Sequence, residues 1–358
     1  MTSHPSGRNR VAAIERALAA EIPGYTAEAA TRNWAELGLD SFDLMTVRAA
    51  CETAAGFDLP DIDWVEAETP AALLQLAARY AEGAVVGTAE GFTLFETVEL
   101  GMPQMAMGGL SENWLFRTLG DLHWRLIAQT LGTRPRDICD ARGERLYPTF
   151  NRIAVRSSLP LADYGEGEQL AMRASLSHFG PGLFFSECEI TGSAGARIEA
   201  RLMSSFTSRS APDSNTDLQR GQPVLPATSQ ARALEAMPEF GLEYRALRQE
   251  RDAPREPLAR TAYEIQPVYD INGVGLLYCA AYPMISDLCE MRALDRDAAT
   301  TMRLSTVARD VCYFANADPG AALEWRLHRD AEELETESSI VRGDGAVMAR
   351  VVTERARV

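Results

Sequence analysis

Apolar positions in the first 85 residues repeat at helical spacing. Val11, Ile14, Leu18 and Ile22 lie three or four residues apart, which predicts an amphipathic helix. Residues 42–55 and 70–80 carry two further amphipathic runs, and Pro70 after Thr69 is typical of a helix start. We therefore expect a small all-α domain over residues 1–85, followed by a Gly-, Ala- and Thr-rich linker over residues 86–97.

After residue 98 the pattern changes to one helix followed by several strands, and then repeats. Residues 111–131 predict the first helix, and four strands follow it at residues 149–157, 169–178, 183–190 and 196–208. A strand at 263–268 and a helix at 283–293 then precede strands at 305–314, 321–330, 334–342 and 346–354. The expected fold class is α+β, with a first half at 98–210 and a second half at 258–358. The connecting segment, 211–257, is rich in Pro, Ser, Gln and Arg and is expected to be a long loop.

Charge and composition exclude several classes of function. The chain has 358 residues, with 51 Asp and Glu against 35 basic residues, so its net charge of -16 disfavours nucleic acids and anionic membranes as partners. Every basic residue is arginine, which excludes lysine Schiff bases and the P-loop. The six cysteines show no metal-ligand spacing and no apolar leader or span is present, so we expect a cytoplasmic protein without a metal.

A motif typical of carrier proteins lies between the first two predicted helices. Residues 37–45 read LGLDSFDLM, with a serine at the start of a helix. Residues 11–82 resemble acyl carrier proteins, in which this serine carries phosphopantetheine, so the resemblance implies attachment at Ser41 by a phosphopantetheinyl transferase. Residues 31–70 contain nine acidic residues against Arg32 and Arg48, a surface suited to basic partners. The alternative is that Asp40 and Ser41 only cap the helix.

The second part of the chain carries motifs of a different family. Residues 269–278 read YDINGVGLLY and precede a predicted helix, as in hot-dog thioesterases, but Val274 stands where those enzymes often have a histidine. Residues 101–105, 108–115 and 120–124 read GMPQM, GGLSENWL and GDLHW. Residues 97–358 resemble the double hot-dog acyltransferase/decarboxylases of polyketide biosynthesis, typified by the leinamycin pathway. The resemblance implies that methylmalonyl-CoA is decarboxylated and that propionyl passes to the phosphopantetheine thiol of a carrier.

The resemblance and the chemistry together suggest four catalytic candidates. An active-site tyrosine is the proposed acyl acceptor in that family, and its best match is Tyr147. Decarboxylation of an α-carboxy thioester leaves an enolate that needs hydrogen-bond donors, which Gly109 and Asn272 could supply. His123 could assist the phenol. Each has an ordinary alternative: a strand aromatic for Tyr147, a helix start for Gly109, a turn for Asn272 and a packing residue for His123.

Two other functions remain open from the sequence. A hot-dog dehydratase or thioesterase would act on a carrier-bound acyl chain, and the nearest dehydratase-like segment is HFGPG at residues 178–182. A non-catalytic scaffold would only hold an acyl group on its carrier. The favoured interpretation is an acyltransferase/decarboxylase that takes an acyl-CoA, loads its own carrier and supplies a polyketide synthase or another carrier-dependent enzyme, with phosphopantetheine as the single cofactor.

Overall fold

The computed structural model describes residues 7–88, 91–106, 108–209, 214–225 and 231–358. The N-terminal part is helical, as expected, and its elements are α1 (Gly7–Glu21), the short turn η1 (Ala29–Thr31), α2 (Ser41–Ala55), α3 (Asp61–Glu66) and α4 (Pro70–Glu82). Thr69 caps α4, because its Oγ1 accepts a hydrogen bond from the Ala72 backbone at 3.1 Å. Leu18, Val47 and Leu73 are buried together between the helices.

The rest of the chain forms one large, mainly antiparallel sheet with two central helices. Its first half contains β1 (Val85–Thr88), β2 (Gly91–Glu99), α5 (Glu112–Leu131), β5 (Tyr147–Ser157), β6 (Gln169–Phe179), β7 (Leu183–Thr191) and β8 (Arg197–Arg209). A short hairpin of β3 (Met105–Ala106) and β4 (Gly109–Leu110) precedes α5, and three single turns are η2 (Met102–Gln104), η3 (Pro135–Asp137) and η4 (Leu161–Asp163).

The second half repeats the strand order of the first. It contains β11 (Ala259–Glu264), α7 (Pro267–Asp270), α8 (Ala281–Ala293), α9 (Ala298–Met302), β12 (Leu304–Tyr313), β13 (Ala322–Ala331), β14 (Glu335–Arg342) and β15 (Val347–Arg357). The strands lie in the order β2-β6-β7-β8-β5 in one half and β11-β13-β14-β15-β12 in the other. β5 and β12 pair at the centre, with Ile153 opposite Val311, so the two halves share one continuous sheet.

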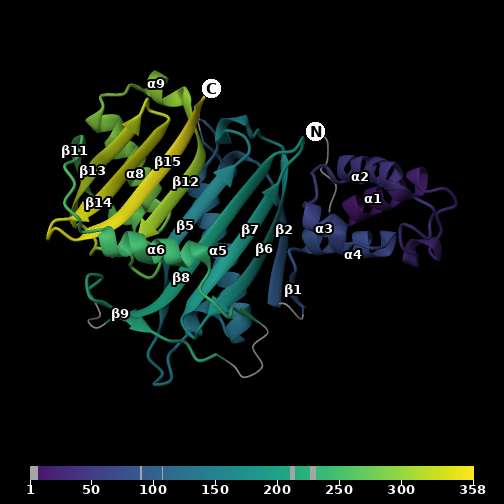
Figure 1. Cartoon of the computed structure of the whole chain (residues 1–358), viewed down its shortest axis with the longest axis horizontal. Helices are drawn as coiled ribbons and strands as arrows, with labels where there is room; N and C mark the ends of the chain where they lie inside the picture. Colours follow the sequence, from purple (N-terminus) through teal and green to yellow (C-terminus); the bar gives the residue numbers. More distant parts are fainter. Residues whose placement is uncertain (1–6, 89–90, 107, 210–213, 226–230) are drawn as a thin grey trace.

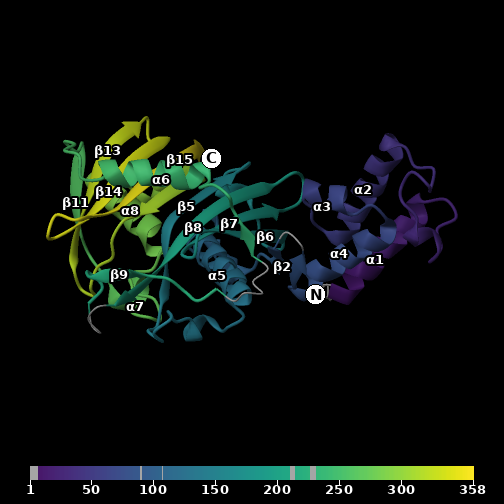
Figure 2. The same ribbon diagram turned by 60° about the horizontal axis from the view of Figure 1, so that its bottom comes forward.

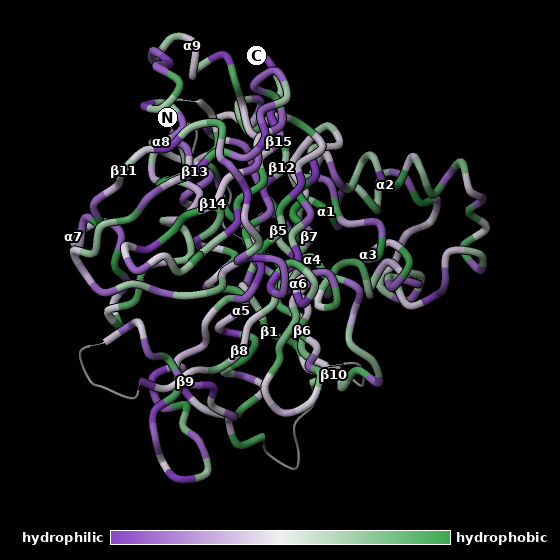
Figure 3. The backbone as a smooth tube through the Cα atoms, turned by 60° about the vertical axis from the view of Figure 1, so that its left-hand side comes forward, coloured by the Kyte–Doolittle hydropathy of each residue, from purple (hydrophilic) through white to green (hydrophobic). Residues whose placement is uncertain are grey.

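The two faces of the sheet carry different helices. Leu119 of α5 and Ile285 of α8 are buried in the main core on one face, whereas Phe240 and Tyr244 of α6 (Glu239–Glu250) pack against the other face. Figures 1 and 2 show α6 crossing the middle of the sheet on the side opposite α5. Hydrophobic and hydrophilic positions are interspersed along the strands, as expected for a sheet covered unevenly on its two faces (Figure 3).

Two expectations from the sequence differ from the structure. Residues 91–97, expected in a linker, lie in β2, because their backbone pairs with β6. The segment 211–257, expected to be a loop, contains α6 and the short strands β9 (Leu218–Gly221) and β10 (Arg232–Ala233). Phe240, Tyr244 and Leu247 recur at helical spacing, but the polar composition around them concealed this signal.

The helical domain is docked against the sheet at β2, β6 and β7 (Figure 1). Arg173 of β6 donates hydrogen bonds to Asp63 at 3.1 Å and Glu66 at 2.8 Å. The Asp58 backbone N–H donates to the Gly192 carbonyl at 2.8 Å, and Tyr80 stacks edge-on against Phe95 at 5.2 Å between ring centres. The contact therefore combines a buried charged hydrogen bond with an aromatic pair.

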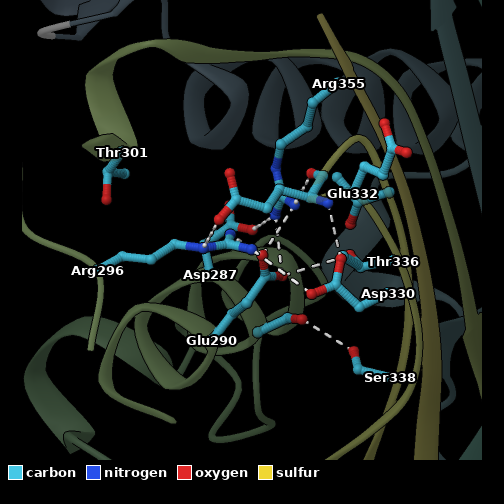
Figure 4. A network of polar contacts seen from close by, with 12 residues as sticks. Asp287, Glu290, Arg296, Thr301, Asp330, Glu332, Thr336, Ser338 and Arg355 are labelled. Carbon is cyan, nitrogen blue, oxygen red and sulfur yellow. Dashed lines mark hydrogen bonds and ion pairs between the residues drawn. The ribbon is translucent and has the colours of Figure 1, made fainter. Parts of the chain in front are cut away.

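Buried arginines hold the two central helices in place. Arg309 of β12 is 1% exposed and bridges Glu112 of α5, at 2.6 Å, to Asp287 of α8, at 2.8 Å. Figure 4 shows the neighbouring network, in which Glu290 of α8 accepts hydrogen bonds from Arg355 at 2.9 and 3.0 Å and also pairs with Arg296. These charges compensate one another inside the second half.

Candidate functional site

A cavity of about 230 Å³ lies between the two halves, where α5, β5 and β8 face the segment before α8. Trp124 comes from α5, Asn151 and Ser205 from the first-half strands, and Asn272 from the turn after α7. The end of β12 and the residues after it, to Asn316, close the opposite wall. Side chains distant in sequence thus meet at the join between the halves, a common place for a ligand.

Asn272 presents a hydrogen-bond donor to this cavity. Its side-chain Oδ1 accepts hydrogen bonds from the backbone N–H groups of Val274 and Leu276, both at 3.0 Å. Within the described part of the chain its Nδ2 has no protein partner. Asn316 Oδ1 fixes the next residue of the turn by accepting from the Leu277 N–H at 3.0 Å. The turn thus holds the Asn272 amide in position while leaving its N–H₂ group available.

Four tyrosines line the cavity, and the hydroxyls of three of them donate hydrogen bonds to backbone carbonyls. Tyr244 donates to the Tyr313 carbonyl at 2.9 Å, Tyr282 to the Ala315 carbonyl at 3.1 Å, and Tyr313 to the Cys279 carbonyl at 3.0 Å.

The fourth tyrosine, Tyr278, has an available hydroxyl, for which the described residues provide no hydrogen-bond partner. Burial raises the pKa of Tyr278, and Arg117 lies over its ring at 5.1 Å. Sequence reasoning missed Tyr278. It stands within the YDINGVGLLY motif, which was the signal that could have identified it.

Tyr147 lies beside the cavity, at the first residue of β5. Pro148 and Thr149, its neighbours in sequence, line the cavity. The Tyr147 ring lies 5.0 Å from the Arg145 guanidinium and 5.1 Å from that of Arg209. Arg209 also donates to the Val274 carbonyl at 2.6 Å. The structure therefore brings Tyr147 close to the turn that holds Asn272.

The cavity contains cations but no carboxylate or imidazole among its described lining residues. Arg220 and Arg248 stand at its edge, and the charges of both act on the Tyr244 hydroxyl. Burial raises the pKa of the Cys279 thiol to about 12, so this group is protonated near neutral pH. The site can bind an anion and donate hydrogen bonds, but it has no conventional general base.

His123 lies outside the cavity, inside the core of the first half. It is 1% exposed, and its two ring nitrogens lie 2.7 Å from the hydroxyls of Ser186 and Ser204. Complete burial lowers its pKa to about 3. The imidazole is therefore neutral and fully hydrogen-bonded, which fits the packing role better than a catalytic one.

Gly109 is also distant from the cavity. It precedes α5, and the twelve residue-to-residue steps from Glu112 to Trp124 span roughly 18 Å at 1.5 Å per residue. Its φ is +98°, and a Cβ there would lie 2.3 Å from the Leu161 carbonyl oxygen, so close packing explains this glycine. At the start of α5 only about 10 Å³ of space remains, beside the ion pair of Glu112 and Arg309.

Ser41 is exposed at the start of α2, and the local structure fits covalent attachment there. Asp40 caps the helix, since its carboxylate accepts hydrogen bonds from the N–H groups of Phe42 at 2.8 Å and Asp43 at 3.0 Å, which lower the pKa of Asp40. The positive end of the helix dipole favours a phosphodiester at this position. The Ser41 hydroxyl is free of hydrogen-bond partners within the described ranges.

The docked domain holds Ser41 away from the sheet. Gly56, which ends α2, lies against Gln169 of β6, and Asp58 contacts the turn after β7. Ser41 is at the opposite end of this 15-residue helix, roughly 20 Å from that contact at 1.5 Å per residue. The attachment serine therefore lies at the end of α2 that is remote from the contact with the sheet.

The described residues provide neither a metal-ligand cluster nor a membrane-spanning helix. No group of three or more His, Cys, Asp or Glu side chains there could hold a metal ion. Nor does any helix in the described ranges combine the length and apolar character that crossing a membrane requires.

Known proteins resemble both the N-terminal helical domain and the sheet domain of the chain. Two solved thioesterase structures resemble the chain. An acyl-ACP thioesterase from Bacteroides thetaiotaomicron has a TM-score of 0.51 and 12% identity, and the match covers 74% of this chain and 98% of the other. A 12:0-ACP thioesterase from Umbellularia californica has a TM-score of 0.50 and 8% identity, with coverage of 74% of this chain and 98% of the other. They show that the sheet domain has the hot-dog type of fold expected from the sequence. No curated protein sequence matches the chain significantly. The family described as "Phosphopantetheine attachment site" matches residues 16–77, so the N-terminal domain is a carrier domain that bears covalent phosphopantetheine.

Proposed function

We propose that this chain is a double hot-dog acyltransferase/decarboxylase fused to its own acyl carrier. It takes methylmalonyl-CoA, or a related α-carboxyacyl-CoA, and loads a propionyl-type group onto the carrier. Ser41 bears the phosphopantetheine, added by a phosphopantetheinyl transferase, and the product passes to a polyketide synthase or another carrier-dependent enzyme. The free cysteines fit a cytoplasmic location.

One observation carries this proposal: the cavity offers hydrogen-bond donors and arginines, and its described lining has no carboxylate or imidazole. Decarboxylation needs stabilisation of an enolate oxygen and a place for the carboxylate before CO₂ leaves, and it needs no base to start. Hydrolysis needs an activated water, and dehydration needs a base to remove a proton. The donor set therefore favours decarboxylation over the thioesterase and dehydratase alternatives.

Tyr147 is the proposed acyl acceptor. Its Oη forms an ester with the acyl carbonyl as the carbon–sulfur bond to CoA breaks, and the phenol proton leaves with the CoA thiol. The bond from the α-carbon to the carboxylate then breaks, and its electron pair forms an enolate to which Asn272 Nδ2 donates a hydrogen bond. A proton from solvent gives the propionyl ester. Transfer to the carrier thiol returns the proton to Tyr147.

Intact-protein mass spectrometry tests the proposal. Wild type, Ser41→Ala, Tyr147→Phe and Tyr278→Phe are each incubated with a phosphopantetheinyl transferase. Each is then treated separately with methylmalonyl-CoA, malonyl-CoA and propionyl-CoA. We expect methylmalonyl-CoA to yield a propionyl adduct on the Ser41 arm of the wild type and of Tyr278→Phe, but not of Tyr147→Phe. If only Tyr278→Phe abolishes the adduct, the cavity phenol is the acceptor and Tyr147 is not. A phosphopantetheine arm that never becomes acylated from any CoA thioester would refute the acyltransferase.

A further inference from the structure

A second, larger cavity opens directly from the candidate site. It has a volume of about 550 Å³ and lies between α6, the turn joining β6 to β7, and the end of β9. Asn151, Ser205, Arg220, Tyr244 and Arg248 line both cavities, so the two spaces meet at these side chains. A long ligand can therefore occupy both at once.

Arginines dominate the polar lining of this second cavity. Arg245 and Arg251 of the α6 region join Arg220 and Arg248, and the described lining residues include no aspartate or glutamate. Arg251 pairs with Asp252 at 3.2 Å. The other three have no ion-pair partner among the described residues, although acidic residues outnumber arginines by 51 to 35 in the whole chain. Three unpaired guanidinium groups around one cavity indicate an anionic ligand with several phosphates.

The opposite wall of the second cavity is apolar. Phe179 and Pro181 lie in and after β6, Met203 lies in β8, and Met237 precedes α6. A flat purine base can pack against such a wall, since aromatic and thioether side chains favour aromatic partners. The cavity thus pairs a surface for a base with a cluster of cations for phosphates.

We propose that the second cavity binds the nucleotide part of a CoA thioester, with its 3′-phosphate and diphosphate at Arg220, Arg245 and Arg248. The pantetheine arm then runs past Asn151 and Tyr244 into the candidate site. The inference rests on the proposed function in taking the donor to be a CoA thioester. A carrier protein fits this space poorly, because its arm has one phosphate and its attachment serine sits on a helix too large for the cavity.

Calorimetric binding to the full-length Ser41→Ala chain tests the site independently of turnover. The probes are CoA, 3′-dephospho-CoA and pantetheine, and the variants are Arg245→Gln, which lines only the second cavity, and Arg201→Gln. Arg201 lies over Phe240 of α6, outside the described lining, and is the matched control. We expect Arg245→Gln to weaken CoA binding by about tenfold, as expected for one lost phosphate contact. Arg201→Gln should bind CoA as the starting chain does.

The three probes separate a lost contact from a misfolded variant. In Arg245→Gln the affinity for pantetheine should be unchanged, and dephospho-CoA should bind the starting chain more weakly than CoA. Equal CoA affinity in Arg245→Gln and in the starting chain would overturn the nucleotide site, as would the absence of CoA binding. If Arg245→Gln, made in the phosphopantetheinylated chain with Ser41 intact, slows only transfer to or from carrier-bound groups, the arginines dock a carrier and the proposal is wrong. Arginine-dependent CoA binding without acyl transfer would leave this site standing and refute the proposed reaction.

Discussion

The buried carboxyl of Asp63 makes the docked carrier domain sensitive to pH. Asp63 is fully buried at the contact between α3 and β6, where Tyr80 donates to it at 2.5 Å and Arg173 at 3.1 Å. Burial outweighs both contacts and raises the pKa of Asp63 from its ordinary value of 3.8 to about 6. The folded state therefore binds a proton at this site more tightly than the unfolded state does.

The difference between the folded and unfolded pKa of Asp63 sets how its contribution to stability depends on pH. A carboxyl with a raised pKa in the folded state contributes most stability below pH 3.8, and this contribution is lost as the pH rises through about 6. At about 1.4 kcal/mol per pH unit, the loss is about 3 kcal/mol. Asp63→Asn cannot ionise, so its free energy of unfolding minus that of the wild type should rise by about 2.5 kcal/mol between pH 4 and pH 8, because part of the loss has already occurred at pH 4.

Hydrogen exchange of the α4 backbone, which contains Tyr80, reports the local opening of the carrier domain at each pH. Asp61→Asn controls for the loss of one negative charge, because Asp61 is an exposed residue of α3, the helix that contains Asp63. If the difference between Asp63→Asn and wild type stays constant from pH 4 to pH 8, the reasoning from burial is refuted.

Three further substitutions test other features of the fold. Gly109→Ala should lower the free energy of unfolding by about 1–3 kcal/mol in urea denaturation, because the left-handed backbone and the Leu161 carbonyl both oppose a Cβ; an unchanged midpoint would contradict the packing explanation. Glu290→Gln should cost about 3–5 kcal/mol in the same assay, since it removes the buried carboxylate with which both Arg296 and Arg355 pair. For His123, whose pKa is lowered to about 3, wild-type stability relative to His123→Asn should fall as the pH drops below 6.5, as acid titration would reveal.

Local sequence patterns predicted most of the helices and strands. The α5 prediction, 111–131, differs from the structure by one residue because Ser111 caps the helix and Gly132 ends it. Helix α6 was missed since its three apolar residues stand in a strongly polar segment. The residues of β2 were assigned to a linker because their pairing with β6 joins positions about 80 residues apart, which no local window includes.

The candidate site was only partly predictable. Asn272 lines the cavity, as its motif suggested, and Tyr147 lies beside it. His123 and Gly109 lie elsewhere, because their roles depend on packing against Ser186, Ser204 and Leu161. The arginines of α6 could not be placed without the fold, since only the path of the chain after β8 brings them over the join between the halves.

The two halves differ in the space that remains at the start of their central helices, which is about 10 Å³ at α5 and about 230 Å³ before α8. The repeated strand order offers two equivalent places for a cavity, yet the ion pair of Glu112 and Arg309 fills one of them. Of these two places, only the one before α8 keeps space for a ligand within the described part of the chain. Both halves line that one cavity with different side chains, an asymmetry that two identical subunits cannot adopt.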